Sequence, residues 1–246
     1  MEIKNNSAGL FDKIISAVFP NRCMCCGEIV SASIFVCAKC AKRMEKIKPP
    51  FCTKCANNVH LCQCEKDMIP RNFDFIISPY YYIDGAKDLV YAIKFDNNRT
   101  VSKLFAQEIC AAVENCFDGT NFDFVCSVPI SKKTLRKRSY NQSELIAREF
   151  CKLSGKLTDD KFNDVLKKIK ETTPQRNLSS KERRRNLRGT FDVDDKYKSA
   201  INGATILLID DVCTTGSTLN ECAKTLKLYG AKNIFCATFC KTLFFN

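Results

Sequence analysis

Histidine is almost absent from this chain: His60 is the single histidine among 246 residues. It lies in a cysteine-rich stretch, two residues before Cys62, and no histidine follows it. Ser-His-Asp triads and Cys-His pairs need an imidazole to accept the proton of the nucleophile. Nucleophilic catalysis that depends on histidine is therefore excluded from the larger, C-terminal part of the chain.

Long apolar runs are missing as well. An amphipathic stretch lies at residues 10–19, but Asp12 and Lys13 interrupt it. No run approaches the ~18 apolar residues that a membrane-spanning helix needs. The sequence predicts neither a signal peptide nor an anchor. We therefore expect a cytoplasmic protein without membrane insertion.

Cysteine, in contrast, is abundant, with 17 residues. An odd number of cysteines without an export signal is typical of a reduced chain rather than of a disulfide framework. Nine of them fall before residue 65, and eight of these nine form three C-x-x-C knuckles and one C-x-C pair. Two residues between thiolates allow both sulfurs to bind one tetrahedral ion, and four thiolates close a structural zinc site. The spacing is therefore typical of zinc ribbons.

This spacing predicts two Cys₄ zinc sites. We expect one Zn²⁺ to be bound by Cys23, Cys26, Cys37 and Cys40, and the other by Cys52, Cys55, Cys62 and Cys64. A crossed pairing fits the spacing equally well, and Cys25 is left over. His60 is an alternative ligand to Cys64, although an exposed loop position is the favoured interpretation. Both ions would be structural and would supply the folding energy of a module too small for a core of its own.

Residues 206–218 say most about function. Residues 206–209 are apolar and predict a buried parallel strand, and the amphipathic run 219–229 predicts a helix. The turn between them offers backbone N–H groups at a helix N-terminus and several hydroxyls, in Thr214, Thr215, Gly216, Ser217 and Thr218. Asp210 and Asp211, at the carboxyl end of the strand, suit a diol or a hydrated Mg²⁺. The stretch therefore predicts a site for a phosphorylated sugar, in which Cys213 is a candidate reactive thiol.

The net charge of +12 is unevenly distributed. Residues 131–190 carry 18 basic and 7 acidic side chains, which accounts for almost the whole excess. The basic residues cluster at 132–138 and at 181–188. A charge run alone usually marks a solvated helix face or a disordered linker. Beside a phosphate site, these runs favour a partner with several phosphates, either pyrophosphate or single-stranded nucleic acid.

The apolar pattern predicts two parts: an N-terminal helix and zinc-ribbon module at residues 1–70, and a main domain at residues 71–246. In the main domain, strands are expected at 75–83, 122–130, 206–209 and 233–241, and helices at 86–95, 100–116, 141–153 and 219–229. This alternation predicts an α/β fold with a parallel sheet flanked by helices. The polar, basic stretch 171–191 suits a mobile flap over the site, or a plain disordered linker.

Several segments together resemble the ComF family of competence proteins. They are the cysteine knuckles, the Lys94 segment, the basic loop that ends at Gln142, the segment 175–191 and the stretch 210–218. The resemblance covers nearly the full length. It implies an N-terminal zinc ribbon on a type I phosphoribosyltransferase-like domain, with a role in handling single-stranded DNA during natural transformation. One departure is Ser139, where the family has glycine.

In type I phosphoribosyltransferases, a stretch like 206–218 binds phosphoribosyl pyrophosphate (PRPP). By resemblance, Asp210 and Asp211 would take the ribose hydroxyls and the turn 214–218 the 5′-phosphate, with Mg²⁺ bound alongside PRPP. The loop after the second strand would contact pyrophosphate through Ser131, Lys132, Lys133, Arg136 and Arg138. The alternative interpretation of that loop is the start of a helix with exposed basic side chains.

Two functions remain open at this point. One is a factor that binds PRPP and Mg²⁺ and processes incoming single-stranded DNA, together with a helicase or channel component of DNA uptake. The other is an enzyme that transfers phosphoribosyl from PRPP to an unidentified acceptor and releases pyrophosphate. Tyr140, Phe150 and Phe191 are candidates for stacking on bases, although core packing is the commoner use of such residues.

Overall fold

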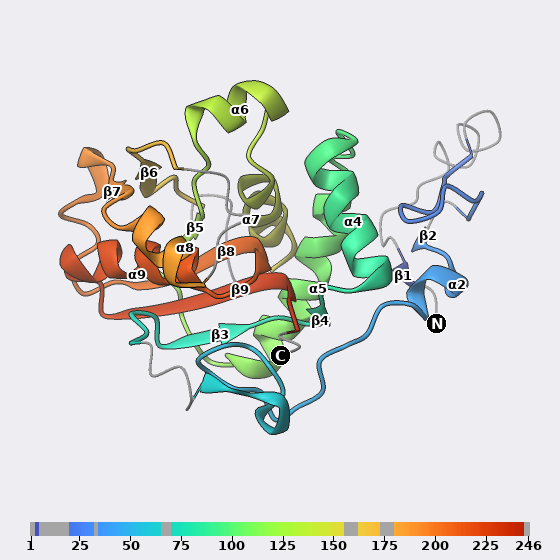
Figure 1. The fold of residues 1–246 in the computed structure, drawn as a ribbon, viewed down its shortest axis with the longest axis horizontal. Helices are drawn as coiled ribbons and strands as arrows, with labels where there is room; N and C mark the ends of the chain where they lie inside the picture. The colour runs from blue at the N-terminus through green and yellow to red at the C-terminus, as the bar shows by residue number, and fades with distance from the viewer. Residues whose placement is uncertain are drawn as a thin grey trace.

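The computed structural model of the chain describes residues 3–4, 20–31, 34–64, 70–154, 162–172 and 180–243. The amphipathic stretch at residues 10–19 lies outside the described residues. A parallel sheet with helices on both faces forms the larger part, and the cysteine-rich N-terminal segments lie beside it (Figure 1). The predicted α/β class is confirmed.

The central sheet has the strand order β3-β9-β8-β5. Its members are β3 (Phe75–Ile77), β9 (Asn233–Lys241), β8 (Thr205–Cys213) and β5 (Phe124–Ser127), and every pairing is parallel. A short strand, β4 (Tyr80–Tyr81), continues along β9 beyond β3. Leu207 and Ile209 of β8 face one core, and Ile206 and Leu208 face the other. Because β8 is buried on both faces, its sequence is a continuous apolar run rather than an alternating one.

Helices cover both faces of this sheet. One core is closed by α4 (Asp84–Phe95), α5 (Val101–Cys116) and α7 (Gln142–Leu153). The other is closed by α9 (Ser217–Leu228), with α8 (Ser180–Leu187) and the antiparallel pair β6 (Leu166–Lys168) and β7 (Phe191–Val193) beside it. Helix α6 (Lys132–Arg138) stands apart, near the end of α4 in Figure 1.

Three predicted elements differ in the structure. The strand expected at 75–83 is split into β3 and β4, both of which pair with β9. The strand expected at 206–209 continues to Cys213, because Asp210 and Val212 still pair with β9. The acid pair therefore lies inside the strand. The prediction of a basic loop after β5 is wrong, because the segment folds into α6. The Ser131 side chain accepts a hydrogen bond from Thr134 N at 3.2 Å and caps this helix.

The predicted flap is structured where it is described. Residues 180–191 form α8 and the start of β7, and Leu187 is buried in the core with α9. Gly189 N also donates to Glu221 Oε1 of α9 at 2.8 Å. Residues 173–179 of the predicted flap lie outside the described residues. The described part of the stretch is thus neither a free linker nor a detached lid in this structure.

Both halves of the cysteine-rich part contact the sheet domain. Its first half contains β2 (Ile34–Val36), which pairs with β1 (Ile3–Lys4), and α2 (Ala38–Ala41). Phe35, Cys40 and Met44 are buried in the same core as Leu89 of α4. Its second half contains the 3₁₀ turn η1 (Val59–Leu61), and Thr53 O accepts a hydrogen bond from Ile76 N at 3.1 Å. The second half therefore covers the β3 edge of the sheet.

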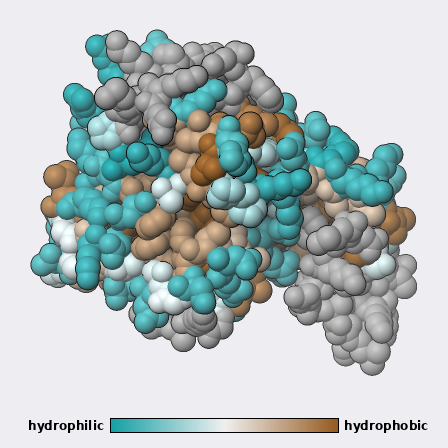
Figure 2. Space-filling view, turned by 90° about the horizontal axis from the view of Figure 1, so that it is seen from below, coloured by the Kyte–Doolittle hydropathy of each residue, from teal (hydrophilic) through white to brown (hydrophobic). Residues whose placement is uncertain are grey.

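Figure 2 shows the molecule from below relative to Figure 1. On this face, hydrophobic residues gather in the middle and hydrophilic ones surround them. None of the described helices has the length and apolar character that crossing a membrane requires.

Candidate functional site

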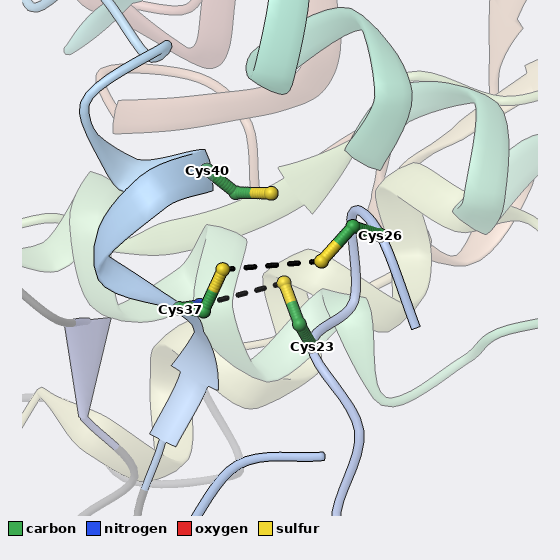
Figure 3. Close-up of side chains that lie close together, drawn as sticks. All are labelled: Cys23, Cys26, Cys37 and Cys40. Atoms are coloured by element: carbon green, nitrogen blue, oxygen red, sulfur yellow. Dashed lines mark hydrogen bonds between the residues drawn. The ribbon is translucent and has the colours of Figure 1, made fainter. Parts of the chain in front are cut away.

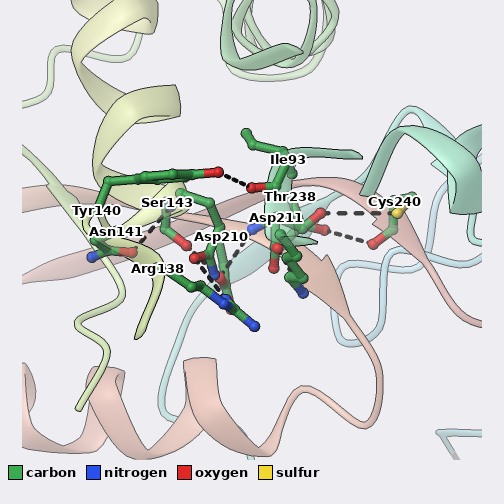
Figure 4. A network of polar contacts seen from close by, with 11 residues as sticks. Ile93, Arg138, Tyr140, Asn141, Ser143, Asp210, Asp211, Thr238 and Cys240 are labelled. Carbon is green, nitrogen blue, oxygen red and sulfur yellow. Dashed lines mark hydrogen bonds and ion pairs between the residues drawn. The ribbon is translucent and has the colours of Figure 1, made fainter. Parts of the chain in front are cut away.

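The acid pair of β8 is held by side chains from two helices. Asp210 Oδ1 accepts hydrogen bonds from Ser143 Oγ at 2.7 Å and from Asp211 N at 2.9 Å. Asp211 Oδ2 forms an ion pair with Lys94 Nζ at 2.6 Å, and Lys94 lies in the last turn of α4. Asn141 caps α7 by accepting from Ser143 N at 3.1 Å, which places Ser143 against the acids (Figure 4). The two carboxylates are therefore fixed in place, not solvated at a loose strand end.

The charges of this group are unbalanced. Burial raises the pKa of Asp210, and the negative charge of Asp211 raises it further, against the opposing effects of Ser143 and Lys94. Burial lowers the pKa of Lys94, but its attraction to the two carboxylates outweighs this, so its pKa is raised overall. One ammonium thus faces two acids, the buried Asp211 and the half-buried Asp210. Such a group gains from a further hydrogen-bond donor or cation, and sugar hydroxyls and Mg²⁺ both meet that need.

The turn between β8 and α9 has the geometry of an anion site. Gly216 has φ +73° and occupies the N-cap of α9, a left-handed conformation that favours glycine. Thr215 Oγ1 accepts from Ser217 N at 3.3 Å and lies 2.7 Å from Ser217 Oγ. The first backbone N–H groups of a helix have no partner within the helix and attract anions.

Lys241 fixes the start of this turn. Its Nζ donates to Thr214 O at 2.7 Å and to Thr242 O at 2.9 Å, and its side chain is only 1 % exposed. Neighbouring Cys213 is buried as well, and this burial raises the pKa of its thiol. Since only the thiolate is a good nucleophile, burial and the raised pKa both disfavour Cys213 as a reactive thiol.

A large cleft opens beside the acid pair. Its volume is about 990 Å³, and it is lined from α4, α6 and the β6 region. Among its described lining residues, one acid, Glu171, faces six cations: Lys94, Arg99, Lys133, Lys137, Arg138 and Lys168. A cleft with this excess of positive charge suits an anion that carries several charges.

The residues predicted for pyrophosphate divide into two groups. Ser131, Lys133 and Arg138 line the cleft, whereas Lys132 and Arg136 are exposed and are absent from its lining. The division follows from α6, because a helix places neighbouring residues on different faces. Arg99 and Lys168 were missed, since they belong to no motif; Lys137 belongs to the predicted basic cluster 132–138 but was not assigned to pyrophosphate.

The aromatic residues predicted to stack on bases are buried. Tyr140, Phe150 and Phe191 are 7 %, 1 % and 5 % exposed; Phe150 and Phe191 pack in the two cores, and Tyr140, although mostly buried, also lines the cleft. The exposed pair is Tyr91 and Phe95 of α4, which are 57 % and 42 % exposed, with ring centroids 4.8 Å apart. Phe95 lines the cleft.

The eight cysteines predicted as zinc ligands lie in two groups of four. The groups are Cys23, Cys26, Cys37, Cys40 and Cys52, Cys55, Cys62, Cys64, and within each the sulfurs lie within 4.8 Å of one another. In the first group, Cys26 Sγ lies 3.9 Å from Cys37 Sγ (Figure 3). In the second, Cys55 Sγ lies 3.7 Å from Cys62 Sγ. Four sulfurs bound tetrahedrally at about 2.3 Å from one Zn²⁺ would be about 3.8 Å apart, so both groups fit zinc.

The two residues considered as extra ligands lie outside both groups. Cys25 Sγ donates to Gly85 O at 3.6 Å, and His60 is exposed in η1. The described cysteine-rich segments thus offer two closed thiolate sites with no open coordination position.

Comparison with known proteins assigns both parts. Residues 14–71 match the double zinc ribbon domain, and residues 136–243 match the phosphoribosyl transferase domain. The chain is 29 % identical to competence protein F of Haemophilus influenzae over 225 residues, which cover 88 % of this chain and 95 % of that protein. It is 25 % identical to the DNA utilization protein YhgH of Salmonella typhimurium over 90 % of each chain. It is 26 % identical to competence protein ComFC of Bacillus subtilis, over 78 % of this chain and 77 % of that protein. The resemblance is confirmed: over most of its length the chain is similar to competence proteins of the ComF type, and it carries a double zinc ribbon followed by a phosphoribosyl transferase domain.

Proposed function

We propose that this protein binds PRPP with Mg²⁺ at the end of β8. Asp210 and Asp211 would receive the ribose hydroxyls, and the turn 214–218 the 5′-phosphate. The pyrophosphate would lie in the basic cleft, near Ser131, Lys133 and Arg138. The observation that carries this proposal is the acid pair with a single lysine partner, placed between the N-terminus of α9 and a cleft with six cations.

Mg²⁺ suits the donors of this site, because it prefers oxygen ligands such as carboxylates and phosphates. When bound, it would neutralise part of the pyrophosphate charge. The protein's own residues would orient the ligand: Ser143 and Lys94 hold the two carboxylates at fixed positions. In the same way, we propose that the two cysteine groups each hold one structural Zn²⁺.

The test is calorimetric titration of Mg²⁺-PRPP into the zinc-loaded protein. The double variant Asp210→Asn, Asp211→Asn is expected to lose binding. The matched control is Asp88→Asn, Asp195→Asn, which removes two exposed acids that pair with Arg43 and Lys198. Silence of the wild type, or equal binding by both double variants, would refute the proposal.

We further propose a role in the uptake or processing of single-stranded DNA. Relatives carry the names competence protein and DNA utilization protein. The cleft could follow a strand's phosphates with its cations, while Tyr91 and Phe95 offer exposed rings for stacking. A cytoplasmic helicase or channel component would deliver the strand. Strong weakening of single-stranded DNA affinity between low and moderate salt is expected, and no binding at low salt would remove this role.

The alternative function is catalytic transfer of phosphoribosyl from PRPP to an acceptor. The volume of the cleft favours it, since about 990 Å³ leaves room for more than pyrophosphate. Lys94 and the cleft cations would stabilise the negative charge that develops on departing pyrophosphate. Release of pyrophosphate from PRPP that depends on an added acceptor would establish the transfer. PRPP binding without any release, across nucleobases and single-stranded DNA, would favour a ligand-binding role.

A further inference from the structure

Arg71, at the end of the cysteine-rich part of the chain, reaches the turn 214–218 between β8 and α9. It is the last residue of the double zinc ribbon match and follows Cys64 by seven positions. Its Nη1 lies 3.4 Å, and its Cζ 3.7 Å, from the point where a Cβ on Gly216 would stand. Gly216 is the central residue of the turn 214–218. A cation from outside the phosphoribosyl transferase match therefore stands against the backbone of the proposed 5′-phosphate site.

The two residues after Arg71 fix this position. Asn72 donates from N and from Nδ2 to Asn220 Oδ1, at 2.7 and 3.3 Å. Asn220 lies in the first turn of α9, and its own N donates to Gly216 O at 2.8 Å. Phe73 is buried in the same core as Cys213 and carries the Arg71 guanidinium over its ring at 5.7 Å. Arg71 is thus held against the turn by the helix that the turn begins.

The guanidinium of Arg71 has no hydrogen-bonding acceptor and no carboxylate partner among the described residues. It is half-buried beside a second cation, because Lys241 donates to Thr214 O in the same turn. Burial lowers the pKa of Lys241, and the charge of Arg71 acts in the same direction. Two neighbouring cations that repel each other beside helix N–H groups and hydroxyls are stabilised by a dianion.

We propose that Arg71 binds the 5′-phosphate, so that a residue of the zinc-ribbon part completes the ligand site of the phosphoribosyl transferase domain. This inference rests on the proposed PRPP binding. Guanidinium is suited to the role, because its planar array of N–H groups matches phosphate oxygens. The proposal separates the two ends of the ligand: Arg71 would act on the 5′-phosphate and not on the pyrophosphate.

The experiment uses two probes that report on these two ends. Ribose 5-phosphate and Mg²⁺-pyrophosphate are titrated separately into the full, zinc-loaded chain. Arg71→Gln is expected to weaken the affinity for ribose 5-phosphate by at least about tenfold, which is the effect of losing a charge-assisted hydrogen bond. The affinity for Mg²⁺-pyrophosphate should stay unchanged. Arg71→Lys should restore part of the affinity, since the charge is kept and the fork is lost.

The matched control is Arg43→Gln, which removes an exposed arginine from the first cysteine-rich half and should change neither affinity. Zinc content and the thermal midpoint are measured for each variant. Equal ribose 5-phosphate affinity in Arg71→Gln and wild type overturns the inference and leaves PRPP binding intact. An equal loss of affinity for both probes, or a loss of zinc, shows that Arg71 has a structural role and also overturns the inference. Absence of ribose 5-phosphate and PRPP binding in the wild type refutes the proposed function itself.

Discussion

The cysteine-rich segments and the sheet domain are stabilised by different means. In the sheet domain, the central strand β8 has Ile206, Leu207, Leu208 and Ile209 fully buried between two helical layers. In residues 20–64, the buried apolar side chains are few, and the most compact features are the two groups of thiols. A hydrophobic core between helical layers thus stabilises the sheet domain, whereas the cysteine-rich segments combine a few side chains buried against α4 with two thiol groups that fit zinc. The turn 214–218 of the candidate site belongs to the sheet domain, and Arg71, seven residues after Cys64, lies against it.

The largest expected effect comes from removing the metal. Structural zinc contributes on the order of 10 kcal/mol to the folding of small ribbon modules, so a strong chelator should unfold residues 20–64 first. Amide hydrogen exchange is the measurement: the cysteine-rich segments should lose protection while β8 and β9 keep theirs. Elemental analysis should give two zinc ions per chain before chelation. Uniform loss of protection across both regions would show that the metal stabilises the sheet domain as much as the cysteine-rich segments.

The sheet domain should respond instead to a cavity in its core. Leu207→Ala removes a fully buried side chain from β8 and should cost about 2–5 kcal/mol of unfolding free energy. Leu228→Ala is the control, because Leu228 is 76 % exposed and should change little. Urea denaturation measures both. The zinc content should be the same in the two variants, and a loss of zinc in Leu207→Ala would show that the two regions fold as one unit.

The ion pair of Lys94 should rank next. Lys94→Met leaves the nearly buried carboxylate of Asp211 without its cation, at an expected cost of about 2–3 kcal/mol. Binding of Mg²⁺-PRPP should weaken as well, because Asp211 loses its fixed position. Lys103→Met on the exposed face of α5 is the control. Unchanged stability and affinity in Lys94→Met would show that the acids need no support from α4.

Gly216→Ala should have a smaller effect on stability and a clear one on binding. The residue has φ +73°, which costs a residue with a Cβ about 1 kcal/mol. The new Cβ would stand 3.4 Å from Arg71 Nη1 and narrow the space for a phosphate. Gly119→Ala is the control, with φ +75° and nothing within 4 Å of the added Cβ. Equal loss of PRPP affinity in both variants would remove the turn from the site.

The smallest effect is one of pH on stability. Burial raises the pKa of Asp210 in the folded chain. A carboxyl group whose pKa is raised by folding binds a proton more readily in the folded chain than in the unfolded chain. The free energy of unfolding therefore falls as the pH rises from the ordinary carboxyl pKa through the folded pKa. Asp210→Asn should therefore raise the thermal midpoint above neutral pH, and this gain should vanish toward pH values near 4, where the ordinary carboxyl is protonated too. A gain that is the same at every pH would contradict the assigned cause.

Local signals predicted much of the fold. The apolar run of β8, the pattern of β9 and the helices at 100–116, 141–153 and 219–229 are strong because burial on a strand or a helix face leaves a clear period. Extension of β8 through Asp210 was not predictable, because two acids look like the end of a strand, and only pairing with β9 continues it. Likewise α6 looked like a loop, since its seven residues carry charges on every side.

The residue types of the site can be read from the chain alone: eight thiols at ribbon spacing, an acid pair, and a hydroxyl-rich turn with Gly216 before a helix. These features are local, because a knuckle or a turn is formed by neighbours along the chain. The distant side chains that surround them are set by the packing of the folded chain. Lys94 and Ser143 come to the acids from α4 and α7, and Arg71 comes to the turn from the ribbon side. Packing of β8 between two helical layers brings these residues together, and no sequence spacing records that packing.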